Sequence, residues 1–166
     1  MTTALMLVLG IVLTAGTFVF VSAEFSLVAV DQAVLDKKAE EGDRGAASVL
    51  RATRTLSTQL SGAQVGITLT TILLGYTTQS ALADLLEDLL GSVGLAWGLA
   101  TGIAAFAAAT FINVFSMLFG ELVPKNLALA HPLATAVRVV PFQMAFTAIA
   151  RPVIWVLGGT ANWVLA

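Results

Sequence analysis

Long hydrophobic runs, each followed by a change to polar residues, dominate the pattern of this chain. Three runs reach or approach the roughly 20 mostly apolar residues that a helix needs to cross a bilayer. They lie at residues 4–30, 63–82 and 95–119. The pattern predicts an all-α membrane protein with three transmembrane helices. The first run is too long for the hydrophobic part of a signal peptide, and no basic residue precedes it, so we expect it to be retained.

The polar segments between these runs differ in charge. Residues 31–60, between the first two runs, mix acidic residues with five basic ones, as expected of a solvated helical linker. Residues 77–94, between the second and third runs, carry three acidic residues and no Lys or Arg. Because Lys and Arg concentrate in cytoplasmic loops, the linker is predicted to be cytoplasmic and the N-terminus to lie outside.

The last segment, residues 126–166, is apolar but is interrupted by Pro132, Pro141 and Pro152. Prolines at these intervals are expected to break it into helices of one to three turns, too short to cross the membrane. We therefore expect short interfacial helices at the cytoplasmic surface. A fourth span beginning near Val153 is the alternative, and it would place the C-terminus outside.

The composition excludes several classes of function. Of the 166 residues, 58% are hydrophobic and 11% are charged, and the net charge is −2. This leaves no broad basic face for nucleic acid. With no cysteine, one histidine and no phosphate-binding loop, the chain has no recognisable catalytic arrangement. We expect a membrane protein that is not an enzyme.

Candidate chemistry is concentrated at the end of the third run, in the segment Gly120–Lys125. Pro124 has no amide hydrogen, so in a continuous helix the carbonyl of Gly120 loses its partner. That carbonyl would lie beside the carboxylate of Glu121, and oxygen atoms of these two kinds bind Mg²⁺ and Ca²⁺. The segment therefore predicts a site for a small cation. Alternatively, Lys125 neutralises Glu121 one helical turn away.

Polar residues also recur at helical spacing in the first two runs. The first run has a stripe of Thr14, Thr17, Val21 and Glu24. The second has a stripe of Gln64, Thr68, Thr71 and Gly75. Asn113 lies two turns before Glu121, near the same side of the third run. We expect these stripes to face one another around a shared site, because polar groups inside a membrane usually face protein or water.

Several of these polar residues also have a purely structural interpretation. Hydroxyl groups in helices often bond to carbonyls of their own helix, and this interpretation is favoured for Thr14, Ser22, Ser26 and Thr70. Gln64 and Asn113 are equally suited to hydrogen bonds between helices. Glu24 is slightly better explained by pairing with Lys125 or Arg54 than by metal binding.

In order along the chain, these motifs resemble the transmembrane module of the CNNM/CorC family of magnesium and divalent-cation transport proteins. The matching segments are Phe20–Val30, Leu56–Thr58, Gln64–Leu69, Leu73–Gly75 and Phe119–Lys125. The resemblance covers nearly the whole chain, and its most specific part is the Gly-Glu-Leu-Val-Pro-Lys block.

The resemblance implies a homodimer of three-helix protomers in the cell (plasma or inner) membrane, with the N-terminus outside and the C-terminus in the cytoplasm. It also implies a belt-like helix within residues 126–166 and soluble regulatory CBS domains, which this chain does not contain. A longer protein or a partner would supply them.

The resemblance further implies a dehydrated Mg²⁺ held between the three helices. By motif, its ligands fall on Thr17 and Val21, on Thr68 and Thr71, and on Glu121 beside Gly120. The chain departs from the family pattern because Val21 offers no oxygen and threonines replace asparagines. Water or Glu24 would then complete the ligand set, or the substrate differs. Supporting positions are Glu24, Gln64, Asn113, Pro124 and Lys125.

We therefore expect the membrane domain of a Mg²⁺ or divalent-cation efflux transporter coupled to Na⁺ influx. Two alternatives remain open. One is export of an organic cation such as a polyamine, and the other is a non-transporting dimeric scaffold for regulatory domains.

Overall fold

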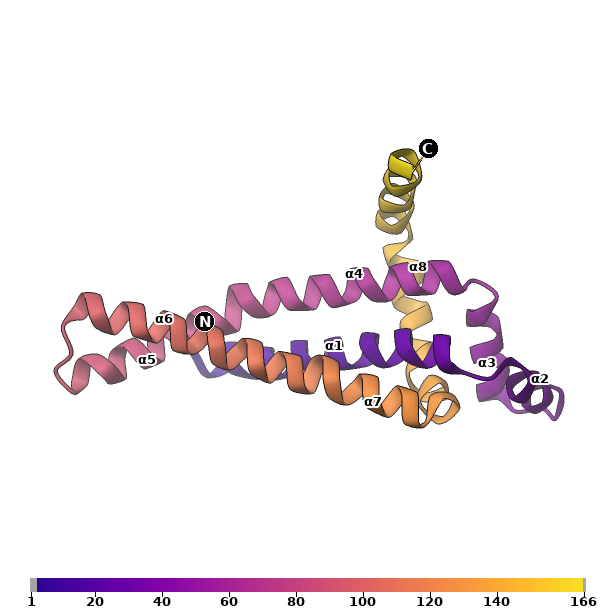
Figure 1. Cartoon of the computed structure of the whole chain (residues 1–166), viewed down its shortest axis with the longest axis horizontal. Coiled ribbons are helices and arrows are strands. Elements are labelled where there is room, and N and C mark those ends of the chain that lie inside the picture. The colour runs from indigo at the N-terminus through magenta and orange to yellow at the C-terminus, as the bar shows by residue number, and fades with distance from the viewer. Residues whose placement is uncertain (1–2, 166) are drawn as a thin grey trace. The chain divides into compact units, whose positions relative to one another are not determined.

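Helices joined by short turns make up the protein in its computed structural model, which describes the backbone of residues 3–165 and the side chains of residues 3–157 (Figure 1). In chain order the elements are α1 (Thr3–Ala29), α2 (Gln32–Glu40), α3 (Arg44–Thr53), α4 (Leu56–Leu74), the π-helix η1 (Gly75–Gln79), α5 (Ser80–Ser92), α6 (Trp97–Phe115), the π-helix η2 (Ser116–Leu122), α7 (Val123–Ala130) and α8 (Pro132–Leu165). Residues 3–165 contain no strand. The predicted all-α class is confirmed.

Three helices in the described part of the chain are long and apolar enough to cross a membrane. They are Thr3–Ala29, Trp97–Ala130 and Pro132–Leu157. The first two contain most or all of the predicted runs 4–30 and 95–119. The predicted run 63–82 is helical, within α4, η1 and α5, but it is not one of the three. Its glutamines and threonines make it more polar than the others.

The expectation that prolines break the tail into short helices is wrong. Pro132 is the first residue of α8, where the missing amide hydrogen costs nothing. Pro141 and Pro152 lie inside α8, which continues through both. An internal proline removes one backbone hydrogen bond, but the bonds on either side persist, and packing of α3 on α8 supports the helix. The third candidate span therefore begins at residue 132, well before Val153.

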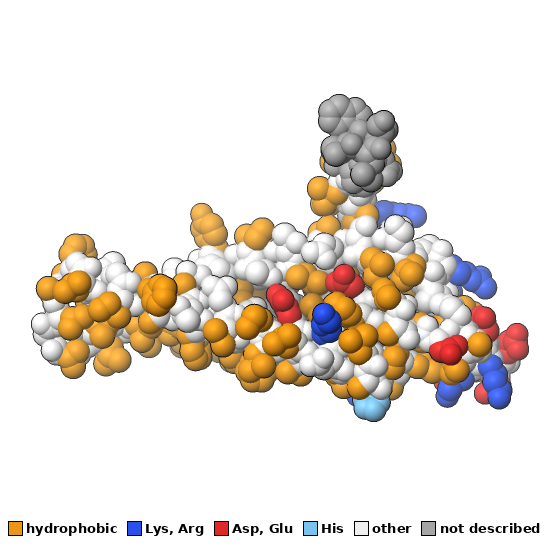
Figure 2. All heavy atoms as spheres, viewed as in Figure 1, with side chains coloured by type: hydrophobic (Ala, Val, Ile, Leu, Met, Phe, Trp, Pro, Cys, Tyr) orange, Lys and Arg blue, Asp and Glu red, His pale blue; other side chains and the backbone are white. Residues whose placement is uncertain are grey.

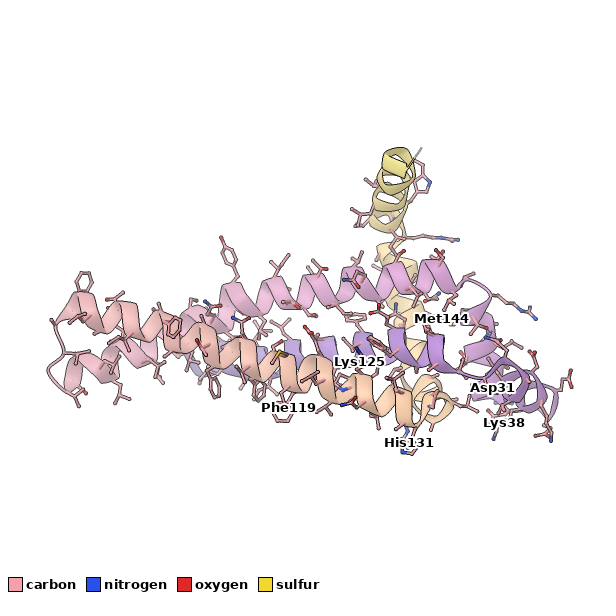
Figure 3. The ribbon with its side chains drawn as sticks, viewed as in Figure 1. Asp31, Lys38, Phe119, Lys125, His131 and Met144 are labelled. Atoms are coloured by element: carbon pink, nitrogen blue, oxygen red, sulfur yellow. The ribbon has the colours of Figure 1, made fainter. Side chains whose placement is uncertain are left out.

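Short capped turns define the linker helices α2 and α3. The Asp31 carboxylate accepts hydrogen bonds from two amides at the start of α2, the nearer at 2.8 Å, and Asp43 does the same for α3 (Figure 3). Between them Gly42 has φ of 90°, a left-handed conformation that glycine adopts without strain. Acidic and basic side chains gather over α2 and α3 (Figure 2). Both elements are helical with exposed charged side chains, and the cytoplasmic position of the linker at residues 31–60 stays a prediction.

The helices divide into two compact units. The first unit comprises Met1–Phe18 and Leu69–Leu122. In it, α5 and α6 pack against each other through a turn at Gly94, where φ is 87° (Figure 1). The contacts α1 makes with α4 and η1 here are close, because Gly16 faces Thr70 and Gly10 faces Thr78. Small residues at such contacts let membrane helices approach closely.

The second unit comprises Val19–Thr68 and Val123–Ala166. The end of α1, the helices α2 and α3, and α8 share a core of buried hydrophobic residues: Leu27, Val30, Leu35, Ala46, Val49, Ala52, Ala136 and Val140. Nearer the start of α1, the Phe20 ring packs on the Phe146 ring in a tilted arrangement, with 4.6 Å between ring centroids, and it also covers Gly66 of α4. Gly66 has no side chain to collide with this ring.

We predict that Gly66→Ala destabilises the protein, because the added Cβ would lie 2.6 Å from the Phe20 ring. Overpacking of this kind typically costs about 1–3 kcal/mol. The matched control is Gly102→Ala in α6, whose Cβ would meet no atom within 4 Å. It should leave stability unchanged or raise it by up to about 1 kcal/mol through helix propensity. Thermal unfolding in detergent measures both, and equal midpoints for the two variants would contradict the packing.

Candidate functional site

The most deeply buried hydroxyl of the first unit belongs to Thr17 of α1, whose relative exposure is 0%. Its Oγ1 lies 2.8 Å from the Oγ1 of Thr70 on α4 and 3.1 Å from the carbonyl oxygen of Leu13. When Thr17 donates to Leu13, it accepts from Thr70. The two hydroxyls therefore join α1 to α4 through side chains that are buried between helices.

Gly120 of η2 lies against Thr17. A Cβ at Gly120 would be 3.3 Å from Cγ2 of Thr17 and 3.5 Å from Oγ of Ser116. Ser116 is also buried. We call Thr17, Thr70, Ser116 and Gly120 the hydroxyl cluster. All four residues belong to the first unit, and Thr17 turns its methyl group toward Gly120 and its hydroxyl toward Thr70.

The backbone of the cluster departs from ordinary α-helix. Ser116–Leu122 is π-helical, and α7 starts at Val123, one residue before the buried Pro124. π-Helical turns insert an extra residue into the hydrogen-bonding register and are frequent at functional sites. The predicted cation-binding segment therefore lies where the helix changes register, although the unpaired state of the Gly120 carbonyl stays a prediction.

Glu121 follows Gly120 directly and is exposed in the single chain. The Nζ of Lys125 lies 4.8 Å from the centroid of the Phe25 ring, a cation–π contact within the second unit (Figure 3). The described residues contain one ion pair, between Lys37 and Glu41. Lys125 therefore has no carboxylate partner there, and the alternative pairing of Glu24 with Lys125 or Arg54 is not observed.

The predicted stripe of the first helix faces inward, because Thr14, Thr17 and Val21 are buried and Glu24 is partly buried. Thr14 also bonds to the Gly10 carbonyl, at 2.9 Å, as its structural interpretation predicts.

The stripe of the second helix does not face inward. Gln64, Thr68 and Thr71 are exposed in the single chain, and Thr68 donates to the Gln64 carbonyl of its own helix at 2.8 Å. The buried face runs through Gly66 and Thr70 instead. Close approach to α1 selects this face, since it carries the glycine and the hydroxyl. A ligand role for Thr68 and Thr71 stays a prediction.

Asn113 is exposed as well, and its Nδ2 donates to the Ala109 carbonyl at 2.8 Å. The buried face of α6 carries Ala100, Ala104, Ala108 and Ile112, and it continues through Ser116 and Gly120 of η2. The structure thus brings together Thr17 and Gly120 among the predicted ligands.

Within the described part of the chain, acidic side chains alone do not form a metal site. Among the described residues, no group of three His, Cys, Asp or Glu side chains is placed to hold a metal ion. A cation bound at the hydroxyl cluster would therefore rely on neutral oxygens and on one carboxylate.

Comparison with known protein families identifies the family of this chain. Residues 8–166 match the Cyclin M transmembrane N-terminal domain, CNNM. The chain belongs to the CNNM family. The match covers all of the hydroxyl cluster and the Gly120–Lys125 segment, so the resemblance found from the motifs is confirmed.

Curated relatives of this CNNM domain come from several bacteria. UPF0053 protein MT1890 of Mycobacterium tuberculosis is 43% identical over 92% of this chain, and UPF0053 protein YhdP of Bacillus subtilis is 33% identical over 94%. UPF0053 protein sll0260 of Synechocystis is 30% identical over 89%. The chain spans about a third of the length of these relatives, at 34%, 35% and 33% respectively.

Two residues of this CNNM domain have environments that differ from their interpretation from the sequence. Thr70 was assigned to bonding within its own helix, yet its hydroxyl pairs with Thr17. Ser22 of α1, in the second unit, is fully buried, and its Oγ has no hydrogen-bond partner among the described residues. A glycine one turn before Thr70 was the available signal for Thr70, because it marks the face that approaches another helix. No sequence signal distinguished Ser22 from Ser26.

We predict that Thr17 and Thr70 are energetically coupled. In a double-mutant cycle of Thr17→Val and Thr70→Val, the coupling energy should be about 0.6 kcal/mol, the average for hydrogen bonds between membrane helices. Reversible unfolding in mixed micelles measures it. The exposed Thr68→Val is the control and should show no coupling to Thr17→Val. Additive effects of Thr17→Val and Thr70→Val would show that the hydroxyl pair contributes nothing.

Proposed function

We propose that this chain is the membrane domain of a Mg²⁺ transporter that exports the ion. The observation that carries the proposal is the hydroxyl cluster. Thr17 pairs with Thr70 at 2.8 Å and contacts the buried Gly120 through its methyl group, and Glu121 is the next residue. Buried polar and ionisable groups in membrane helices most often mark ion pathways.

The ligand chemistry suits a hard cation. Mg²⁺ binds oxygen atoms, often through only one or two carboxylates, and usually keeps several waters. Hydroxyls of the cluster, the carbonyl of Gly120 and the Glu121 carboxylate are ligands of this kind. Binding would require the Thr17 and Thr70 hydroxyls to turn from each other toward the ion. Water would occupy the position at which Val21 offers no oxygen.

Transport would follow from alternating access to this site. Na⁺ influx is the proposed driving force, because the membrane voltage opposes cation export by about 2.3 kcal/mol per charge per 100 mV. The N-terminus would lie outside and the basic linker inside, in the plasma or inner membrane. A homodimer and CBS-type regulatory domains are the proposed partners. Export of a polyamine, or a scaffold without transport, are the competing functions.

We predict that Glu121→Gln reduces Mg²⁺ flux at least tenfold, because an amide keeps the shape of the side chain but removes its charge. Vesicles containing the protein and a Mg²⁺-sensitive dye measure the flux, with and without a Na⁺ gradient. Glu87→Gln on α5 is the matched control and should transport normally.

Each result of this experiment is decisive. Unchanged flux in Glu121→Gln would remove this carboxylate from the mechanism. Flux of labelled putrescine but not Mg²⁺ in the wild-type protein would favour the polyamine exporter. Flux of neither would favour the scaffold.

We also predict that Ser22→Ala separates function from stability. A buried hydroxyl without a partner costs about 1–3 kcal/mol, so its removal should preserve or raise the unfolding midpoint. If the Ser22 oxygen binds the cation during transport, Mg²⁺ flux should nevertheless fall severalfold in this variant. Thr14→Val is the control, because the Thr14 hydroxyl already bonds to Gly10. Normal flux in Ser22→Ala would assign this serine to packing alone.

A further inference from the structure

A cavity of about 310 Å³ lies inside the first unit, beside the hydroxyl cluster. Its walls include Leu7 and Ile11 of α1, Leu74 of α4, and Ile112 and Phe115 of α6. Every lining residue belongs to the first unit, and α1 and α6 belong to candidate membrane spans. The cavity is partly open rather than enclosed.

The two polar side chains in the wall present no free hydrogen-bond donor. The hydroxyl of Thr14 donates to the Gly10 carbonyl at 2.9 Å, and that of Thr78 donates to the Met6 carbonyl at 3.0 Å. Ordered water needs two to four polar partners, so this cavity is a poor site for water. A hydrocarbon guest would instead supply the dispersion contacts that an empty cavity forfeits.

The size of the cavity suits part of a lipid chain. At about 310 Å³ it is roughly twice the volume of an engineered apolar cavity of about 150 Å³ that stays dry and binds benzene. Acyl chains are the medium around helices that cross a membrane, and a partly open apolar cavity in such helices is accessible to them.

We propose that this cavity binds an acyl chain of a membrane phospholipid. The bound chain would fill the space between α1, α4 and α6 and set their spacing. On each of α1, α4 and α6, one lining residue is about one helical turn from a residue of the hydroxyl cluster: Thr14 from Thr17, Leu74 from Thr70, and Ile112 from Ser116. The binding itself does not depend on the proposed transport of Mg²⁺.

A quenching experiment on the full chain tests the proposal. Trp97, Trp155 and Trp163 are replaced by Phe, and Phe115→Trp places a single fluorophore in the cavity wall. Phosphatidylcholine with brominated acyl chains is titrated into the protein at constant detergent concentration. Bromine quenches tryptophan on contact, so we expect quenching that saturates at one lipid per chain.

The control reporter is Phe106→Trp on the same helix, because Phe106 is 76% exposed and does not line the cavity. It should be quenched in proportion to the brominated lipid in the micelle, without saturation. Ile112→Phe, or Leu74→Phe if the first variant unfolds, should reduce the saturable quenching of Phe115→Trp at least fivefold. Ile103→Phe lies outside the cavity wall and should leave it unchanged.

Two outcomes would overturn the proposal. One is quenching of Phe115→Trp that follows Phe106→Trp without saturation, or that neither filling variant reduces while the protein remains folded. The other is the absence of quenching in Phe115→Trp together with disulfide crosslinks between two chains that carry Phe111→Cys. That result would show that a second copy covers the cavity. Thermal unfolding of each variant verifies its fold, and these readouts are separate from Mg²⁺ flux.

Discussion

Oxygen atoms buried in a membrane protein must find partners inside the protein, because hydrocarbon offers none. Thr17 meets this constraint through Thr70 at 2.8 Å, and the other features of the first unit follow from that contact. Two hydroxyls can pair between helices only where the backbones approach closely. Gly16 permits this at Thr70, and Gly120 permits it at Thr17. The hydrogen bond thus joins α1 to α4 where glycines let the helices approach, and Gly120 of η2 lies against α1 at the same residue, Thr17.

The second unit joins its helices through a side-chain nitrogen, while the buried Oε1 of the same side chain has no hydrogen-bond partner among the described residues. Gln143 of α8 is fully buried, and its Nε2 donates to the Gln59 carbonyl of α4 at 2.9 Å and to Thr147 at 3.0 Å. Gly62 lies against Thr147, so this contact also combines a glycine with a hydroxyl. In both units, polar bonds between helices give specificity, whereas hydrophobic burial alone distinguishes poorly between protein and lipid.

The positions of most helices could be predicted from the sequence, whereas the faces that these helices bury could not. Run length predicts α1 and α6, and the mixed charges of residues 31–60 predict the helical linker. The single helix through Pro141 and Pro152 was missed because proline weakens a helix locally, while neighbouring contacts decide whether it ends.

The candidate site was predicted in part for a related reason. On α4, Thr68 and Thr70 are alike in chemistry, and only packing against Gly16 selects Thr70 for the interior. Sequence spacing finds a polar stripe but does not show which of two neighbouring stripes meets another helix. The Gly120–Lys125 segment was easier to find, because it combines an acid, a proline and a base at the end of an apolar run.

The most direct test of the account is to locate a bound ion. Mn²⁺ can replace Mg²⁺ in oxygen sites, and its anomalous scattering in crystals of the protein reveals its position. We expect one peak per chain within bonding distance of Thr17 or Thr70 and of Glu121, and we expect Glu121→Gln to remove it. Peaks confined to the acidic residues of α5, with none at the hydroxyl cluster, would contradict the account.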